Sequence, residues 1–364
     1  MDIKKIAEGF GIKADTLTYT ECKRGHINST FFINTNAENT EPEYVFQKIN
    51  TSIFKNPDQL MSNIFNVTSH IRNKLIAEGK DANRCVLNFI KTVDGKRCYV
   101  DDDGSHWRAY HFVGKALSLD LADTTDLFAQ SGFAFGHFQN QLADFDASKL
   151  YETIPNFHNT VSRLNDLKEA IAKNLASRKD IAQKEIDFVL TREDKCSYIV
   201  DGIKEGKYPL RVTHNDTKLN NVLLDKATGD GLCVVDLDTV MPGSMLYDFG
   251  DSIRFGASSA AEDETDLSKV FVRLDMFEAY TEGFIKGLDG AVTNEEIAAF
   301  PLSAYIITLE TGIRFLTDYL NGDTYFRIHR PDHNLDRARN QFKLVADMET
   351  KMDEMNKIVA KYIK

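Results

Sequence analysis

The sequence predicts an α+β fold of two lobes, with a small antiparallel sheet in the N-terminal lobe and a larger, mainly helical C-terminal lobe. In the first third of the chain, short runs of β-branched and aromatic residues alternate with polar turn residues. After Gly114, apolar residues recur at helical spacing through most of the chain. We therefore expect a sheet-rich lobe over residues 1–112 and a helical lobe over residues 113–364.

One helix interrupts the predicted strands of the first lobe. Asn56 can cap it, Pro57 suits its first turn, and apolar residues repeat at helical spacing until Gly79 ends it. Strands are expected within the stretches ECKRGHINSTFFINTN, EPEYVFQKIN, CVLNFIKTV, RCYVDDDG and HWRAYHFV. In the second lobe, strands return only between Tyr208 and Asp238.

Composition and charge exclude several classes of protein. The 364 residues are 42% apolar and 27% charged, which is typical of a soluble globular protein with room for two domains. No apolar run approaches the length of a membrane span, and the first residues, MDIKKIAEGFGIKADTL, resemble neither a signal peptide nor a transit peptide. The five cysteines form no CxxC pair, as expected of reduced thiols in a cytoplasmic protein. A net charge of -11 argues against a nucleic-acid partner, because phosphate contacts need a positive surface.

The stretch YPLRVTHNDTKLNNVLLDKATGDGLCVVDLDTVMPG carries the residues that we expect to do chemistry. It places His214-x-Asp216-x4-Asn221 before an apolar strand, a turn, a second apolar strand and Asp236. An enzyme that transfers a phosphoryl group needs a carboxylate beside the attacking hydroxyl and oxygen ligands for the magnesium that bridges the phosphates. Asp216 suits the first role, and Asn221 and Asp236 suit the second.

A simple hairpin supports the predicted metal pair. If NVLLD folds back on LCVVD around Thr228-Gly229, Asn221 and Asp236 are equally far from the turn and lie opposite each other. Directly paired strand residues have Cβ atoms about 5 Å apart, so the two side chains could share one metal ion. A slip of one residue in the loop would spoil this pairing.

Other interpretations of these residues stay open. The HxDxxxxN spacing alone also fits ordinary turn residues, and the surrounding strand, loop and hairpin are what favour catalysis. Lys218 either neutralises charge on the transferred group or is a solvated loop lysine. Asp238, on the same strand face as Asp236, is either a second metal ligand or an acceptor that supports the first.

Three stretches, HNDTKLNN, VVDLDTVMPG and YDFGDSIRF, resemble the aminoglycoside phosphotransferase and choline kinase superfamily, which has the protein-kinase-like fold. Within it, the sequence is most similar to the N-acetylhexosamine 1-kinases, through RGHINSTFF, VFQKINTSIFKNPDQLM, IPNFHNT and ETGIRFLTDYLNGDTYF. These stretches lie between residues 24 and 326, so the resemblance covers most of the chain. It implies magnesium-dependent transfer of the ATP γ-phosphate to the anomeric hydroxyl of N-acetylglucosamine or N-acetylgalactosamine, with Asp216 accepting the proton.

The resemblance also implies backbone contacts to the nucleotide. The segment GHINST would be the turn over the phosphates, with Gly25 and Asn28 allowing close approach of the backbone. Alternatively, the segment is an ordinary hairpin turn with no role in phosphate binding. The segment YHFVG, which contains Tyr110 and Phe112, falls where a hinge would meet adenine.

Lys48 is the residue that the resemblance assigns to the α- and β-phosphates. It ends an alternating strand, and Gln47 points to the other face. In protein kinases the strand lysine pairs with a glutamate on the following helix, whereas the predicted helix from Asp58 to Leu75 contains none. We therefore expect Asp58 or the phosphates alone to position Lys48.

Arg314 and Tyr325 are the expected sugar contacts. Arg314 lies in an otherwise apolar helix and Tyr325 follows in GDTYF, where the resemblance places the sugar. A guanidinium can donate several hydrogen bonds to hydroxyls, and a tyrosine can both stack and donate. Alternatively, Arg314 forms a salt bridge with Glu310, four residues earlier on the same helix. His158, in PNFHNT, is interpreted as a structural histidine.

The letters Asp248-Phe249-Gly250 match the metal-binding motif of protein kinases, but the sequence favours Asp236 as the metal ligand. Asp236 comes 15 residues after Asn221, close to what one hairpin requires, whereas Asp248 comes 27 residues after it. We expect Asp248 to cap or brace the segment that enters the next helix, or to support the catalytic loop.

The sequence thus predicts a cytoplasmic kinase that uses ATP and Mg²⁺ and binds a small sugar, with neither nucleic acid nor membrane as a partner. Two other functions stay open: a kinase for an aminoglycoside, choline or homoserine, and an inactive kinase-like binding protein. An inactive protein would usually have lost Asp216, Asn221 or Asp236, and all three are present.

Overall fold

The computed structural model describes residues 1–364 except 14–15, 23–26 and 37. The chain divides into two compact units, which we call the strand unit and the helical unit. The strand unit comprises Met1–Ser118, Asp144–Pro155 and Val222–Pro242, and the helical unit comprises Leu119–Ala143, Asn156–Asn221 and Gly243–Lys364. The first segment of the strand unit ends at Ser118, six residues after the expected boundary at residue 112. Each unit is built from three segments of the chain.

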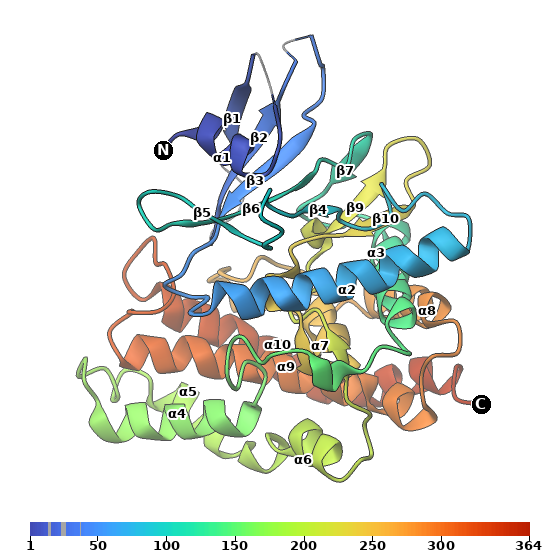
Figure 1. The fold of residues 1–364 in the computed structure, drawn as a ribbon. Helices are drawn as coiled ribbons and strands as arrows, with labels where there is room; N and C mark the ends of the chain where they lie inside the picture. Colours follow the sequence, from blue (N-terminus) through green and yellow to red (C-terminus); the bar gives the residue numbers. More distant parts are fainter. Residues whose placement is uncertain (14–15, 23–26, 37) are drawn as a thin grey trace. The chain divides into compact units, whose positions relative to one another are not determined.

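The strand unit holds most of the strands and two α-helices (Figure 1). Its elements are α1 (Ile3–Gly9), β1 (Thr18–Cys22), β2 (Ser29–Asn34), β3 (Tyr44–Lys48), α2 (Pro57–Ala77), β4 (Phe89–Ile90), β5 (Tyr99–Val100), β6 (His106–His111), β7 (Ala116–Ser118), the 3-10 turn η1 (Ala147–Lys149), β9 (Val222–Asp225), β10 (Gly231–Val234), the 3-10 turn η4 (Leu237–Thr239) and the start of β11 (Met241–Gly243).

Helix α2 begins as the sequence predicts. The Asn56 side chain accepts a hydrogen bond from the Gln59 backbone N–H, and Pro57 occupies the first turn, where its missing N–H costs nothing. The buried side chains include Leu60, Ile64 and Val67 at helical spacing. The helix contains no glutamate before its C-cap residue, and Asp58 lies in its first turn, so the positioning of Lys48 by Asp58 or by the phosphates stays a prediction.

A six-stranded antiparallel sheet forms the centre of the strand unit. The strand order is β1-β2-β3-β6-β4, with β5 also paired to β6, and Figure 1 shows β1, β2, β3 and β6 side by side. Phe46 and Trp107 lie on the face of this sheet that packs against Ile3 and Ile6 of α1. The sequence analysis missed α1, which is too short for a clear periodic signal and depends on this packing.

A second, three-stranded sheet has the order β10-β9-β7. Strand β7 lies beyond Gly114, in the region expected to be helical until Tyr208, so that expectation is wrong. Three residues are too few to show an alternating pattern, and pairing with β9 is what makes the segment a strand.

The helical unit contains eight of the α-helices in the described part of the chain and one short strand. Its elements are α3 (Thr125–Gln141), α4 (Thr160–Lys173), α5 (Gln183–Leu190), η2 (Glu193–Lys195), α6 (Tyr198–Lys204), β8 (Arg211–Thr213), η3 (Leu219–Asn221), α7 (Met245–Gly256), η5 (Leu267–Lys269), α8 (Leu274–Leu288), α9 (Asn294–Leu320) and α10 (His333–Ala360). Among the residues described, no helix combines the length and the apolar character needed to cross a membrane.

Helices α3 and α8 approach each other closely because both carry glycines at the contact. A Cβ atom on Gly136 would lie 2.1 Å from the Phe284 carbonyl oxygen, and one on Gly283 would lie 2.1 Å from the Ala129 carbonyl oxygen. No side chain fits at these distances, so the packing of this helix pair requires glycine.

Candidate active site

The predicted catalytic residues lie in one loop of the helical unit, between β8 and η3. The Asp216 Oδ1 atom is 2.8 Å from the Lys218 Nζ atom, and Asp216 Oδ2 accepts a hydrogen bond of 3.1 Å from the Asn221 side chain. The Asn221 nitrogen also donates to the Asp216 carbonyl oxygen, at 2.8 Å. Asn215, just before Asp216, has a φ of +65°, which Asn adopts more readily than most residues. The loop thus brings Asp216, Lys218 and Asn221 together.

Lys218 is held in an ion pair. Burial acts to lower its pKa, but the carboxylates of Asp216 and Asp251 outweigh burial and raise it. Lys218 therefore stays charged beside the Asp216 carboxylate, and its side chain is only 34% exposed. This position favours a role in charge neutralisation over the alternative of a solvated loop lysine. Contact of Lys218 with a transferred group stays a prediction.

Asp248 on α7 holds the backbone of the catalytic loop. Its buried carboxylate accepts hydrogen bonds from the backbone N–H groups of His214, at 2.9 Å, and Asn215, at 2.7 Å. Gln139 of α3 donates to the same carboxylate at 2.7 Å. Burial raises the pKa of Asp248, and these donors oppose the rise. The prediction that Asp248 supports the loop is confirmed, whereas the cap of α7 is Ser244.

Asp251 is a second brace, which the sequence analysis missed. It accepts a hydrogen bond of 3.1 Å from the Thr217 backbone N–H, and Arg254 donates two hydrogen bonds to its other oxygen. Burial opposes its ionisation, but Arg254 and Lys218 lower its pKa overall. The available signal was the spacing of Asp248 and Asp251, which puts both carboxylates on one face of α7.

His158 and Glu310 form a buried pair behind the loop. The Glu310 Oε1 atom is 2.8 Å from the His158 Nδ1 atom, and Glu310 Oε2 accepts a hydrogen bond of 2.6 Å from Thr160. The second ring nitrogen of His158 is 3.4 Å from the Asn215 carbonyl oxygen. The interpretation of His158 as a structural histidine is confirmed.

Arg314 does not pair with Glu310 in the described part of the chain, so the alternative of a helix salt bridge is wrong. Its guanidinium carbon lies 5.4 Å from the centre of the Phe157 ring and 5.6 Å from the centre of the Phe326 ring. The Glu310 carboxylate already serves His158 and Thr160, which leaves Arg314 to stack on aromatic rings.

The Tyr325 ring adjoins the same aromatic group, 4.8 Å from the Phe326 ring, and its side chain is largely exposed. Asp318 at the end of α9 fixes this segment, because its carboxylate accepts hydrogen bonds from the backbone N–H groups of Thr324, Tyr325 and Phe326. The sequence analysis missed Asp318. The structure therefore brings Arg314 and Tyr325 into one cluster, and their contact with sugar stays a prediction.

Asp236 belongs to a turn of the strand unit that follows β10. Its φ and ψ are both 59°, a left-handed conformation, and its side chain is exposed. Asp238 is buried in η4, where Arg108 and Asn28 donate hydrogen bonds to its carboxylate. Both Asp238 oxygens have protein donors, which favours a supporting role over direct metal binding.

The expected register of the β9–β10 hairpin is wrong. Pairing Asn221 with Asp236 would require Val222 to lie opposite Val235, whereas Val222 pairs with Val234. The register shifts between Gly231 and Cys233, and the strand ends before Asp236. Near the turn, Gly231 pairs with Leu224, which is two residues from the expected register, and the bulge reduces this offset to one. The remaining slip of one residue removes the argument from strand pairing. The assignment of Asn221 and Asp236 as metal ligands stays a prediction.

The predicted nucleotide residues are all in the strand unit. Gly25 lies outside the described residues, and Asn28 donates to Asp238. Lys48 is exposed at the end of β3, two residues after Phe46 and so on the sheet face that α1 covers. Tyr110 ends the run of β6 that pairs with β4, and the Phe112 backbone N–H donates to the Glu43 carbonyl oxygen at 2.9 Å. Contacts of these residues with a nucleotide stay predictions.

The predicted metal ligands have the atoms that magnesium prefers. The Asn221 nitrogen is used by Asp216, so the amide oxygen is its possible ligand atom, and Asp236 offers an exposed carboxylate. Within the described ranges, no three His, Cys, Asp or Glu side chains form a metal cluster. Mg²⁺ commonly binds one or two protein oxygens and completes its shell with phosphate and water oxygens, so these residues fit the ion.

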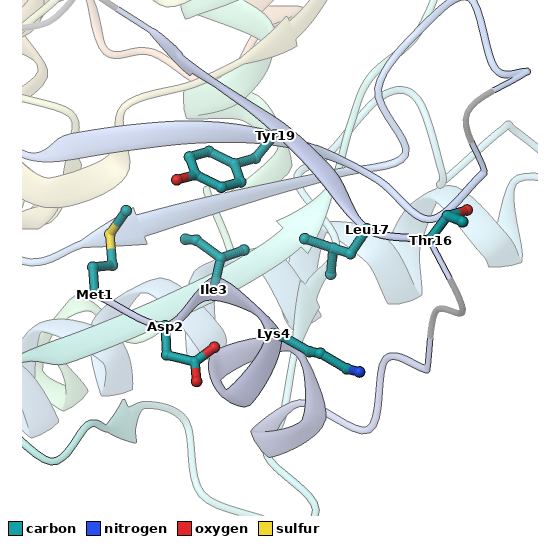
Figure 2. A pocket seen from close by; sticks show the side chains of 7 residues that line it. All are labelled: Met1, Asp2, Ile3, Lys4, Thr16, Leu17 and Tyr19. Carbon is teal, nitrogen blue, oxygen red and sulfur yellow. The ribbon is translucent and has the colours of Figure 1, made fainter.

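Two cavities are lined by none of the predicted site residues. A surface hollow of about 760 Å³ lies beside α1, and the side chains that line it are shown in Figure 2: Met1, Asp2, Ile3, Lys4, Thr16, Leu17 and Tyr19. A cavity of about 340 Å³ in the helical unit is lined partly by Leu219 and Arg254. Neither Arg314 nor Tyr325 lines it.

Comparison with known proteins places these observations in a family. The family model described as "Phosphotransferase enzyme family" (APH) matches residues 18–276, which is more than half of the chain. A choline kinase from Cryptosporidium parvum Iowa II superposes with a TM-score of 0.58 at 14% identity, over 95% of this chain and 93% of its own.

Two further solved structures are similar over nearly their whole length. A spectinomycin phosphotransferase in complex with ADP and spectinomycin has a TM-score of 0.57 at 13% identity, over 97% of both chains. An amicoumacin kinase in complex with AMP-PNP, Ca²⁺ and its ligand has a TM-score of 0.57 at 13% identity, over 96% of this chain and 92% of its own. At this identity the likeness shows the fold, and the expected two-lobed α+β, protein-kinase-like fold is confirmed.

Proposed function

Because the chain belongs to the phosphotransferase enzyme family, we propose that it is a kinase that transfers the γ-phosphate of ATP to the anomeric hydroxyl of an N-acetylhexosamine. The products would be the sugar 1-phosphate and ADP. The observation that carries the proposal is the loop in which Asp216 lies 2.8 Å from Lys218 and accepts a hydrogen bond from Asn221.

Asp216 is the proposed base. It accepts the proton of the attacking hydroxyl, and its carboxylate is 29% exposed, so that a substrate can reach it. Lys218 places a positive charge beside the reacting groups. Phosphoryl transfer requires mostly positioning and charge neutralisation from the protein, and a loop held at several backbone atoms supplies the positioning.

Asn221 and Asp236 are the proposed ligands of Mg²⁺, through an amide oxygen and a carboxylate. When bound, the ion would supply positive charge that offsets the negative charge of the phosphates. The chain's own contribution is the orientation of the ligand atoms: the Asn221 nitrogen is anchored on Asp216, and the Asp236 backbone adopts a left-handed conformation. For the nucleotide we propose Gly25, Asn28, Lys48, Tyr110 and Phe112.

The acceptor is proposed from the cluster of Arg314, Tyr325 and Phe326. Aromatic faces stack on sugar rings, and guanidinium and phenol groups donate to hydroxyl and acetamido oxygens. The Asp318 carboxylate preorganises the segment that carries Tyr325. Cys85, Cys98, Cys196 and Cys233 are free thiols, which supports a location in the cytoplasm.

A substrate panel tests the proposal. The protein is incubated with Mg²⁺, ATP and, separately, N-acetylglucosamine, N-acetylgalactosamine, glucose, galactose, choline, homoserine and an aminoglycoside. Mass spectrometry detects the product, and phosphorus NMR identifies the hydroxyl that carries the phosphate. We expect 1-phosphates of the two N-acetylated sugars.

Other outcomes of the panel identify the alternatives. Phosphorylation of choline, homoserine or the aminoglycoside alone would keep the kinase and replace the acceptor. Tight ligand binding without turnover on any acceptor would indicate an inactive binding protein.

A further inference from the structure

A buried ion pair of the strand unit has no part in the function proposed above. Arg108 of β6 is 2% exposed and Asp238 of η4 is 3% exposed. The Arg108 Nη1 atom donates to Asp238 Oδ1, and Nη2 donates to Oδ2 at 3.0 Å. This two-pronged geometry fixes the orientation of the carboxylate as well as its position.

A second contact ties Asp238 to the segment that precedes β2. The Asn28 nitrogen donates to Asp238 Oδ2, and the Asn28 oxygen accepts a hydrogen bond of 2.9 Å from the Asn50 backbone N–H. Asp238 is therefore held from two directions by parts of the chain that are far from it in sequence.

The guanidinium is itself anchored across the sheet. The Arg108 Nε atom donates to Gln47 Oε1 at 2.8 Å, and the Gln47 nitrogen donates to Thr30 Oγ1 at 3.0 Å. The strand register pairs Gln47 with both Arg108 and Thr30. Three neighbouring strands thus determine where Arg108 points.

This row of residues lies on one particular face of the sheet. Phe46 and Trp107 belong to the core on the α1 face, so their chain neighbours Gln47 and Arg108 lie on the opposite face. Lys48 shares the α1 face with Phe46. The sheet therefore presents Arg108, and not Lys48, on the face where Asp238 is bound.

We propose that Arg108 is the positioning residue of the turn that carries Asp236: through Asp238 it sets the direction in which the Asp236 carboxylate points. The inference rests on the proposed function, in which Asp236 is a ligand of the nucleotide-bound Mg²⁺. A φ of +59° is unfavourable for residues other than glycine, and although aspartate adopts it more readily than most, surrounding contacts are needed to hold one orientation of the turn. The ion pair two residues later is the enforcing contact, and Asn28 assists it.

Nucleotide binding with and without metal tests the inference. ADP affinity is measured by titration calorimetry, once with excess Mg²⁺ and once with EDTA, for the intact chain and for Arg108→Lys and Gln47→Ala. We expect Arg108→Lys to weaken Mg²⁺-dependent binding by about 10- to 100-fold, the range typical of groups that orient metal ligands. Gln47→Ala, which removes the acceptor that anchors the Arg108 guanidinium, should act in the same direction by less, and affinity in EDTA should not change.

Arg192→Lys is the matched control, because Arg192 also makes a two-pronged pair, with Glu349 of the helical unit. It should leave both affinities unchanged. If Arg108→Lys does not fold, as judged by circular dichroism, the Mg²⁺-dependent affinity of Gln47→Ala is the deciding measurement.

Two results would overturn the inference: an equal loss of affinity with and without Mg²⁺, or unchanged Mg²⁺-dependent affinity in folded variants. If the unmodified chain itself showed no effect of Mg²⁺ on ADP binding, the metal part of the proposed function would fail as well.

Discussion

The catalytic loop and the turn of Asp236 are stabilised by different kinds of contact. In the loop, buried carboxylates of α7 accept hydrogen bonds from the backbone N–H groups of His214, Asn215 and Thr217. In the turn, one buried side chain, Asp238, is held by other side chains. Each region has a non-glycine residue with positive φ beside or at its proposed reactive group.

The two kinds of site differ in how much their side chains contribute to folding free energy. Loss of a carboxylate under the loop leaves buried backbone donors unsatisfied, which costs folding free energy. The carboxylates of Asp216 and Asp236, by contrast, are at least partly exposed and should contribute little to stability. Substitutions should therefore separate chemistry and metal binding from folding.

The largest expected effect is on turnover in Asp216→Asn. An amide cannot accept the proton of the hydroxyl, so we expect kcat to fall by about 10²- to 10⁴-fold. ATP binding should persist, because the backbone of the loop keeps its contacts to α7. Steady-state kinetics and calorimetry measure the two quantities, with Asp353→Asn on the exposed surface of α10 as the control. A near-normal rate would rule out Asp216 as the base.

Asp236→Ala should abolish the effect of Mg²⁺ on nucleotide affinity. The loss should exceed about 100-fold, since removal of a ligand costs at least as much as removal of a group that orients one. The melting temperature should fall only slightly, because the side chain is exposed and the main cost is that of placing alanine at a positive φ. Unchanged affinity for Mg-ATP would contradict the assignment.

Asp248→Asn should show the opposite pattern. One carboxylate oxygen becomes an NH₂ group facing a buried backbone donor, so we expect a loss of about 1–3 kcal/mol in unfolding free energy. Mg²⁺ affinity should stay within a few-fold of that of the unmodified chain. Urea unfolding and calorimetry on the same preparations test the contrast with Asp236→Ala, and equal metal defects would remove it.

The smallest effect is a pH dependence at Glu310. Burial opposes its ionisation, but the His158 imidazole and the hydrogen bonds from His158 and Thr160 outweigh burial, so its pKa lies below the ordinary 4.5. A lowered carboxylate pKa contributes stability that is present above pH 4.5 and is lost as the pH falls through the folded-state pKa. The difference in unfolding free energy between the intact chain and Glu310→Gln should therefore narrow below pH 4.5. Urea unfolding at a series of pH values measures it, and a constant or widening difference would show that Glu310 is not stabilised as a carboxylate.

Local signals predicted parts of the fold well. The Asn56 cap, the following proline and the apolar spacing located α2 within two residues of its end, because all of these act within a few turns of one helix. The same reasoning missed α1 and β7, which are too short to carry a period and exist through their packing or pairing. It also misjudged the β9–β10 register, since the turn is not centred on Thr228-Gly229 and the bulge before Cys233 compensates for only one of the two residues of difference.

The site shows the same division. The spacing of Asp216 and Asn221 indicated that the two side chains lie together, because both belong to one short loop, and the catalytic role of that loop stays a prediction. The spacing of Asp248 and Asp251 indicates that both carboxylates lie on the face of α7 that holds this loop, although only Asp248 was predicted to do so. The pairing of Arg108 with Asp238 joins residues 130 positions apart, and no local pattern could have indicated it.

The sequence by itself determined the order of the main elements, the reactive residue types and their local spacing, because periodicity, caps and loop motifs act over a few residues. Only the tertiary structure decided which charges meet. In it, Glu310 pairs with His158 instead of with Arg314. Lys48 lies on the sheet face that α1 covers, and Arg108 forms a buried ion pair with Asp238. Ion pairs and strand faces depend on which distant segments pack together. Once a pair is buried, the loss of one partner costs much free energy, because the other charge is left without compensation.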